Sequence, residues 1–258
     1  MSKIIAISMQ KGGAGKTTTA VNLAATLKSK NKRVLLIDMD AQANATFYSG
    51  TDSYNLENSL YNLLTDDSRY SCIAQDVILR KPFYDLIPAD RDVADLVGEI
   101  SDPKKLKNKL AIVNDLYDYI IIDCPPALNI LTVNAFTAAD YIIIPCEPRP
   151  FSFTGLRDLA QTINDVQRNW NRKLEVLGIL LVKYHERTNV NKQLRSLINT
   201  EAASLDTRCF TTTIREGIVV PESQIAQEPL FIYSETAKPT QDYINFTREI
   251  INLLENRR

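Results

Sequence analysis

Short continuous apolar runs recur along the chain, and longer helical patterns separate them. Continuous runs of this length are typical of strands that are buried on both faces of a parallel sheet. Because such strands alternate with helices, the pattern predicts an α/β fold: a doubly wound, mainly parallel sheet with helices on both faces. The expected strands are residues 4–7, 34–37, 83–88, 119–122, 141–145, 176–182 and 210–215.

The closing segment, residues 243–254, has an amphipathic pattern. Tyr243, Phe246, Ile250 and Leu254 form one apolar stripe at helical spacing. We expect this helix to cover the sheet. The alternative is a helix that lays the same stripe on a membrane surface.

A glycine-rich stretch connects the first strand to the first helix. Gly12, Gly13 and Gly15 allow successive backbone N–H groups to turn inward around an anion. The helix that begins near Gly15 adds the positive end of its dipole. Lys16 can then reach the β- and γ-phosphates of a nucleotide, and the Thr17 hydroxyl can ligate Mg²⁺. The stretch therefore predicts a phosphate-binding loop.

This loop departs from the common pattern G-x-x-x-x-G-K-S/T. The place of the first glycine is taken by Gln10, and a second lysine, Lys11, precedes the glycines. Lys-Gly-Gly-x-Gly-Lys-Thr resembles the deviant Walker A loop of the ParA/MinD family of ATPases. In that family the earlier lysine reaches across a dimer interface to the partner's ATP, a role that the resemblance gives to Lys11. The nucleotide contacts that it implies are Lys11, Gly12, Gly13, Ala14, Gly15, Lys16, Thr17 and Thr18.

Carboxylates follow two of the predicted strands. Asp38 and Asp40 end one strand and Asp123 ends another, at the edge where doubly wound sheets bind ligands. Strand alternation places Asp38 and Asp40 on one side, so that one can support a Mg²⁺ shell while the other orients water. The resemblance implies that Asp40 positions the attacking water and that Asp123 is a Walker B acid near Mg²⁺. The implied catalytic set is Lys11, Lys16 and Asp40, and the implied metal set is Thr17, Asp38 and Asp123.

The net charge of −1 argues against a protein that is basic throughout. Residues 168–215, however, contain nine Lys or Arg and four acids, a balance of +5. A local positive face of this kind is sufficient to bind a phosphate backbone. The first predicted strand lies at the start of the sequence, with no room before it for a helix-turn-helix, so we expect DNA binding to be sequence-nonspecific.

Four residues in or beside this basic region are candidates for DNA contact. The resemblance implies that Arg187, in an Arg-Thr-Asn motif, contributes to nonspecific binding. Lys192 and Arg195 follow at i, i+3 spacing and share a helix face; the alternative is an ordinary solvated face. The family's second arginine falls on Val219 here, so Arg215 is a nearby substitute.

The remaining composition narrows the function classes. The four cysteines form no C-x-x-C pair, and no signal peptide or membrane-length apolar run is present, so we expect reduced thiols in the cytoplasm. Scattered cysteines and a single histidine argue against a metal-cluster carrier or reductase. The length fits one ATPase domain over residues 1–258.

Together, the residues and the resemblance predict a ParA-type ATPase with ATP and Mg²⁺ as cofactors. The resemblance implies a homodimer with ATP sandwiched between its subunits, nonspecific binding to nucleoid DNA, and a low basal rate of hydrolysis. A ParB-like protein or another cargo adaptor would stimulate hydrolysis and release the DNA, which would partition or position a plasmid, a chromosome or other cargo. The alternative is a MinD-like regulator that cycles on a membrane.

Overall fold

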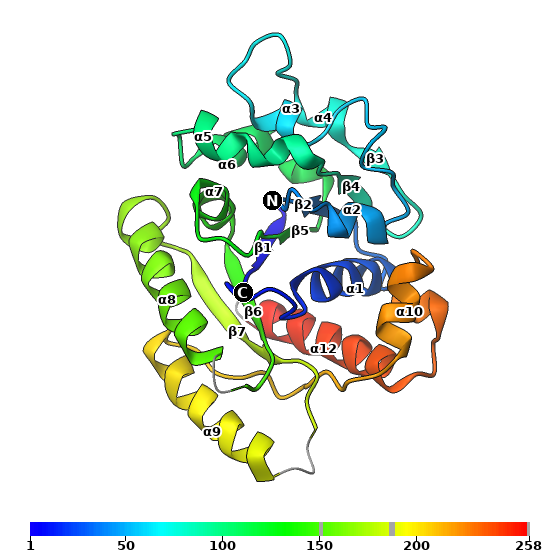
Figure 1. The fold of residues 1–258 in the computed structure, drawn as a ribbon, viewed down its shortest axis with the longest axis vertical. Helices are drawn as coiled ribbons and strands as arrows, with labels where there is room; N and C mark the ends of the chain where they lie inside the picture. The colour runs from blue at the N-terminus through cyan, green and yellow to red at the C-terminus, as the bar shows by residue number, and fades with distance from the viewer. Residues whose placement is uncertain (150–151, 186–188, 257–258) are drawn as a thin grey trace.

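A computed structural model describes residues 1–149, 152–185 and 189–256 of the chain. Within these ranges a sheet of seven strands has the order β3-β4-β2-β5-β1-β6-β7 (Figure 1). Every neighbouring pair is parallel except β3–β4 at one edge. The strands are β1 (Lys3–Ile7), β2 (Val34–Asp38), β3 (Leu79–Arg80), β4 (Asp85–Ile87), β5 (Tyr119–Asp123), β6 (Tyr141–Cys146) and β7 (Glu175–Leu181).

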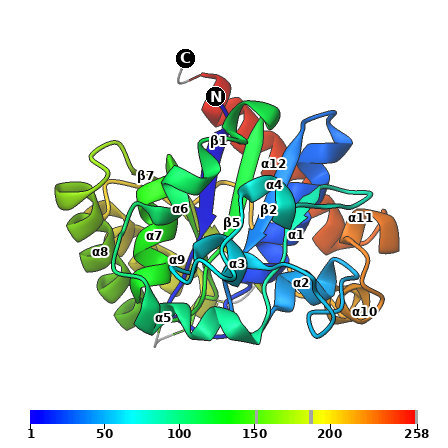
Figure 2. The ribbon, with the colours of Figure 1, turned by 90° about the horizontal axis from the view of Figure 1, so that it is seen from above.

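Helices cover both faces of this sheet, as Figures 1 and 2 show. The α1 and α12 helices pack side by side on one face, whereas α6, α7 and α8 lie on the other. The helices are α1 (Lys16–Ser29), α2 (Asn44–Tyr48), α3 (Leu60–Leu64), α4 (Ala74–Val77), α5 (Leu96–Glu99), α6 (Lys105–Leu110), α7 (Ile130–Ala138), α8 (Ser152–Asn169), α9 (Asn189–Ser204), α10 (Val219–Ile225), α11 (Leu230–Tyr233) and α12 (Lys238–Glu255), with short 3-10 turns η1 (Arg91–Ala94) and η2 (Asn114–Leu116). The predicted doubly wound, mainly parallel fold is confirmed.

The core explains why the strands appear as continuous apolar runs. Alternate side chains of each central strand enter different apolar clusters, one on each face of the sheet. On β1, Ile5 and Ile7 pack in the cluster that holds α1 and α12, while Ile4 and Ala6 pack in the cluster that holds α6 to α8. Both kinds of position are buried, so no polar alternation remains.

The last helix covers the sheet, as expected. Tyr243, Phe246, Ile250 and Leu254 are all buried in the cluster shared with α1. The Tyr243 hydroxyl is also 3.2 Å from the Thr19 hydroxyl oxygen of α1. The stripe that would serve a membrane-surface helix is therefore already occupied. Among the helices that the structure describes, none combines the length and the apolar character needed to span a membrane.

The strand predicted at residues 210–215 is wrong. This segment makes only isolated bridges beside β7, at Cys209 and at Ile214. Between them, the backbone N–H groups of Thr211 and Thr212 donate to the Glu249 carboxylate of α12, at 2.8 and 2.9 Å. A carboxylate on the neighbouring helix thus takes the hydrogen bonds that a continuous ladder would need.

We expect Gly178→Ala to destabilise the fold. A Cβ on Gly178, in β7, would lie 2.7 Å from two ring atoms of Phe210, and this ring packs edge-on against Phe246 at a centroid distance of 5.0 Å. Forcing the buried ring aside should lower the free energy of unfolding by about 1–3 kcal/mol, measured by chemical denaturation. The control is Gly98→Ala, where a Cβ meets nothing within 4 Å; an equal loss there would contradict the steric explanation.

Candidate functional site

The glycine-rich loop passes from β1 to the N-terminus of α1. Gly13 and Gly15 have φ angles of 72° and 82°, in the left-handed region that favours glycine. Gly15 is the N-cap of α1 and gives it no side-chain cap, and the first turn carries no acid. The N-terminal amides of this helix therefore keep their capacity for an anion. Lys16 lies beside them and is only 8% exposed.

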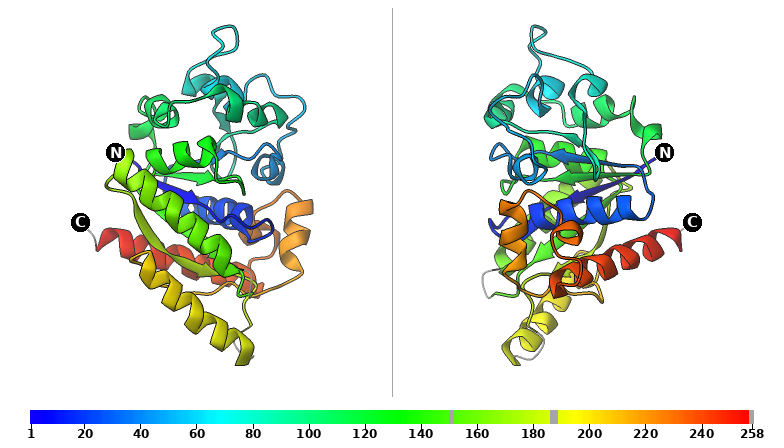
Figure 3. Two further views of the ribbon diagram at one scale, coloured as in Figure 1. Left: turned by 60° about the vertical axis from the view of Figure 1, so that its left-hand side comes forward. Right: turned by 90° about the vertical axis from the view of Figure 1, so that its right-hand side faces the viewer.

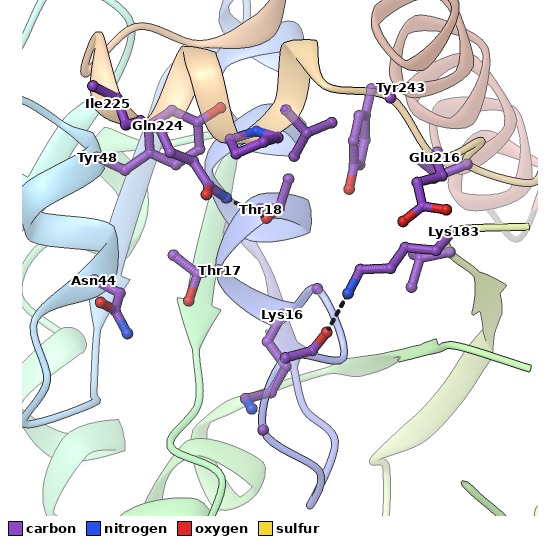
Figure 4. A pocket seen from close by; sticks show the side chains of 18 of the residues that line it. Lys16, Thr17, Thr18, Asn44, Tyr48, Lys183, Glu216, Gln224, Ile225 and Tyr243 are labelled. Atoms are coloured by element: carbon purple, nitrogen blue, oxygen red, sulfur yellow. Dashed lines mark hydrogen bonds between the residues drawn. The ribbon is translucent and has the colours of Figure 1, made fainter. Parts of the chain in front are cut away.

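A cavity of about 960 Å³ opens in front of this loop, a size within the range of small-molecule sites. Its floor includes Lys16, Thr17 and Thr18 (Figure 4). One wall comes from the segment after β2, which includes Asp40. The opposite wall comes from Val182 and Lys183, directly after β7, from residues 214–225 and from α12. The cavity therefore joins the phosphate-binding loop to a partly apolar recess, which suits a nucleotide with charged and aromatic ends.

Asp38 and Asp123 lie next to each other at the ends of β2 and β5, where they are register partners. Asp38 is fully buried, and its carboxylate accepts hydrogen bonds from the backbone N–H groups of Asp40 and Thr46 and from the Thr46 hydroxyl, at 2.8 to 3.1 Å. Burial raises the pKa of Asp38 to about 6, although these hydrogen bonds act against the rise. Asp38 thus anchors the start of α2 as well as bordering Asp123.

Asp123 is a buried carboxylate with unused acceptors. Neither of its oxygens receives a hydrogen bond of ordinary geometry from the described residues. Its pKa is raised far above the usual value, first by burial and then by the charge of Asp38; the Thr17 hydroxyl and the Lys16 charge lower it again. Unpartnered carboxylate oxygens beside a hydroxyl are a donor set that fits a hydrated Mg²⁺ ion.

Asp40 is placed differently from the other two acids. It is half-buried and lines the cavity. One carboxylate oxygen accepts the backbone N–H of Gln42 at 3.0 Å, which fixes the side chain beside the cavity. Asp40 can therefore act on a molecule inside the cavity, unlike Asp38, whose oxygens are engaged in the interior.

Lys11 lies on the same loop but is not one of the residues that line the cavity. Its side chain is half-buried, and the cavity floor is supplied by Lys16 from the same chain. Lys16 therefore lines the cavity of its own chain and Lys11 does not. This arrangement argues against a role for Lys11 in its own cavity.

Sequence reasoning missed the wall opposite Asp40. Gln224 of α10 donates to the Thr18 hydroxyl at 2.9 Å, and Tyr243 of α12 also faces the cavity (Figure 4). Lys183, directly after β7, is a further lining residue. Only Lys183 had a usable signal, because it follows a strand at the ligand edge as Asp38 and Asp123 do.

The four candidate DNA contacts are placed unevenly. Arg187 lies outside the described residues, and Lys192 is on α9 with its side chain undescribed. Arg195 of α9 lies over the Tyr184 ring, 5.9 Å from its centroid. Arg215 donates to both carboxylate oxygens of Asp242, at 2.6 and 2.9 Å. This pairing with α12 holds Arg215 in the cavity wall, apart from the α9 residues.

Comparisons with known proteins show the family of this chain. Residues 2–176 match the family described as the AAA domain. The chain is 37% identical to the sporulation initiation inhibitor protein Soj of Bacillus subtilis, covering 97% of this chain and 98% of that protein. It is 33% identical to the chromosome partitioning protein ParA of Caulobacter vibrioides, covering 97% and 94%.

A solved structure with the same fold carries a nucleotide. The septum site-determining protein MinD of Pyrococcus horikoshii, solved in complex with Mg-ADP, superimposes with a TM-score of 0.79 at 25% identity, over 100% of this chain and 99% of that one. The deviant loop and the acids at the ends of β2 and β5 point to the same family as these full-length similarities. The chain belongs to the ParA/MinD family of P-loop ATPases, in which Soj and ParA are its relatives.

Proposed function

We propose that this protein is a ParA-type partition ATPase, an ATP-operated switch that dimerises around its nucleotide. The observation that carries the proposal is the different placement of the two lysines of the loop. Lys16 is buried at the cavity floor, whereas Lys11 on the same loop is not part of the cavity lining. A second lysine that does not serve its own cavity is suited to serve the cavity of a second copy.

ATP and Mg²⁺ are the proposed cofactors. The loop amides of residues 12–18 hold the phosphates, and Lys16 neutralises charge on them. Thr17 and Asp123, with Asp38 behind them, would hold Mg²⁺, which supplies positive charge against the phosphate oxygens. Asp40, the acid that faces the cavity, orients the attacking water and accepts hydrogen bonds from it.

Dimerisation follows from the charge at the loop. Two nucleotides facing each other bring several negative charges to one interface, and a lysine from the opposite chain offsets part of that repulsion, as an arginine finger supplied in trans does. Lys11 provides this charge. Hydrolysis weakens the attraction, so the dimer is stable only while ATP is intact.

The proposed ligand of the ATP-bound protein is nonspecific DNA, which binds through α9 and Arg187. Arg187, Lys192 and Arg195 belong to the stretch with a charge balance of +5, and Arg195 of α9 lies over the ring of Tyr184, which follows β7. We propose Arg215 only as an indirect contributor, because Asp242 engages its guanidinium. A cargo adaptor that stimulates hydrolysis would release the DNA, and the protein would act in the cytoplasm on the nucleoid.

The strength of DNA binding tests the proposed DNA contacts. We expect Arg187→Glu to weaken binding of the ATP-bound protein to random-sequence DNA by about tenfold or more at moderate salt, because a phosphate contact is lost and a repulsion is added in each subunit. Electrophoretic mobility shifts at several salt concentrations measure this. Arg248→Glu, on the exposed side of α12, carries the same charge change and should bind as the wild type does. Equal binding by Arg187→Glu would move the DNA face elsewhere.

The MinD-like alternative, cycling on a membrane, has less support. Its natural anchor would be the last helix, and the apolar stripe of α12 is buried against α1 and the sheet. Binding of the ATP-bound protein to anionic liposomes, without binding to DNA, would favour the alternative.

A further inference from the structure

Lys183, the residue that follows β7, has an unusual backbone conformation. Its φ angle is 51°, in the left-handed region that residues with a Cβ rarely adopt. The backbone is fixed on both sides: Val182 donates to the Cys146 carbonyl and Tyr184 to the Ile214 carbonyl, each at 3.0 Å. Such a conformation persists only where the surrounding structure determines it, and it is found mainly at functional sites.

The side chain of Lys183 reaches the phosphate-binding loop. Its ammonium donates to the carbonyl oxygen of Gly13 at 3.2 Å (Figure 4). A carboxylate oxygen of Glu147, a side chain that is only 12% exposed, lies 3.8 Å from the same ammonium. Glu147 directly follows β6. Residues at the ends of β6 and β7 thus hold the Lys183 ammonium at the loop together.

The loop needs such a support because its tip has little packing of its own. Gly12 and Gly13 are exposed, and a Cβ added to either would meet no heavy atom within 4 Å. Glycine has more backbone freedom to lose than any other residue. The charged hydrogen bond from Lys183 therefore restricts the backbone of Gly13, which packing leaves free.

The contact also sets the direction of the next amide. In a trans peptide the C=O and N–H groups point in opposite directions. When Lys183 holds the Gly13 carbonyl, the N–H of Ala14 is directed away from Lys183. Ala14 is itself buried, at 2% exposure, so the peptide unit is held at both ends.

We infer that Lys183 is a positioning residue of the phosphate-binding loop, which orders the Gly13–Ala14 peptide before the nucleotide arrives. The inference rests on the proposed nucleotide site. Lys183 acts on the loop amides rather than on one phosphate group, and these amides serve ADP and ATP alike. Its loss should therefore weaken both nucleotides to the same extent.

The test compares three variants in titrations with fluorescent ADP and with a fluorescent non-hydrolysable ATP analogue, each with Mg²⁺. Lys183→Asn removes the ammonium, and asparagine tolerates the left-handed conformation; we expect about tenfold weaker binding of both nucleotides. Lys183→Arg keeps a long cationic donor and should restore most of the affinity. Lys81→Asn is the matched control, because Lys81 donates to the Gly50 carbonyl at 3.0 Å, away from the cavity.

The inference is contradicted if Lys183→Asn binds both nucleotides as the wild type does, or if only the ATP analogue is weakened, which would indicate direct contact with the γ-phosphate. A lower melting temperature of nucleotide-free Lys183→Asn would likewise contradict it, since the role would then be general stability. A wild-type protein that binds neither nucleotide would instead refute the proposed function itself.

Discussion

Lys11→Ala is expected to bind ATP as a monomer and to lose the ATP-dependent dimer. The side chain lies off its own cavity, so its removal should leave nucleotide affinity within about threefold of the wild type. The dimer should weaken by about a hundredfold or more, because each interface loses a buried charge that faces the partner's phosphates. Light scattering coupled to size-exclusion chromatography, with a non-hydrolysable ATP analogue, measures the loss directly.

The control for this result is Lys30→Ala, at the opposite end of α1, where the side chain is exposed. It removes the same charge far from the loop and should dimerise normally. An ATP-dependent dimer of unchanged affinity in Lys11→Ala would end the proposal that this lysine acts in trans. Loss of nucleotide binding by the monomer would show instead that Lys11 serves its own cavity.

Asp40→Ala is expected to hold ATP without turning it over. Asp40 is the acid of the β2 exit that faces the cavity, and removal of a group that orients and accepts from water costs about a hundredfold or more in rate. The dimer should persist, because the loop, Lys11 and Lys16 are untouched. Single-turnover hydrolysis of labelled ATP, with DNA present, gives the rate, and light scattering gives the dimer.

Asp165→Ala, on the exposed surface of α8, is the matched loss of a carboxylate and should hydrolyse ATP at the wild-type rate. Wild-type turnover by Asp40→Ala would remove the water-positioning role. A variant that no longer dimerises would show that Asp40 shapes the site rather than the chemistry.

Local signals predicted one side of the candidate site. The glycines that turn the loop, Lys16 behind them and Asp123 after a buried strand are readable because each depends on neighbours in sequence. Strand register then brings Asp38 and Asp123 together, as expected for acids at the carboxyl ends of parallel strands. The fold class follows from the same continuous apolar runs.

The opposite side depends on contacts between distant residues. Gln224 reaches Thr18 across 206 positions of sequence and Lys183 reaches Gly13 across 170, and no spacing rule covers such distances. The failed strand at 210–215 has the same cause. The composition of this segment favours a strand. However, Glu249, on a helix that comes later in the chain, accepts the hydrogen bonds of its backbone amides.

The position of α12, the last helix, alongside α1 (Figure 3) has a consequence for biosynthesis. Glu249 fastens Thr211 and Thr212, Asp242 fastens Arg215, and Tyr243 reaches Thr19 beside the loop. During translation the phosphate-binding loop leaves the ribosome first, yet these anchors of its far wall are missing until the last helix has emerged. A nascent chain therefore carries the signature of a phosphate-binding loop long before it has a complete nucleotide pocket.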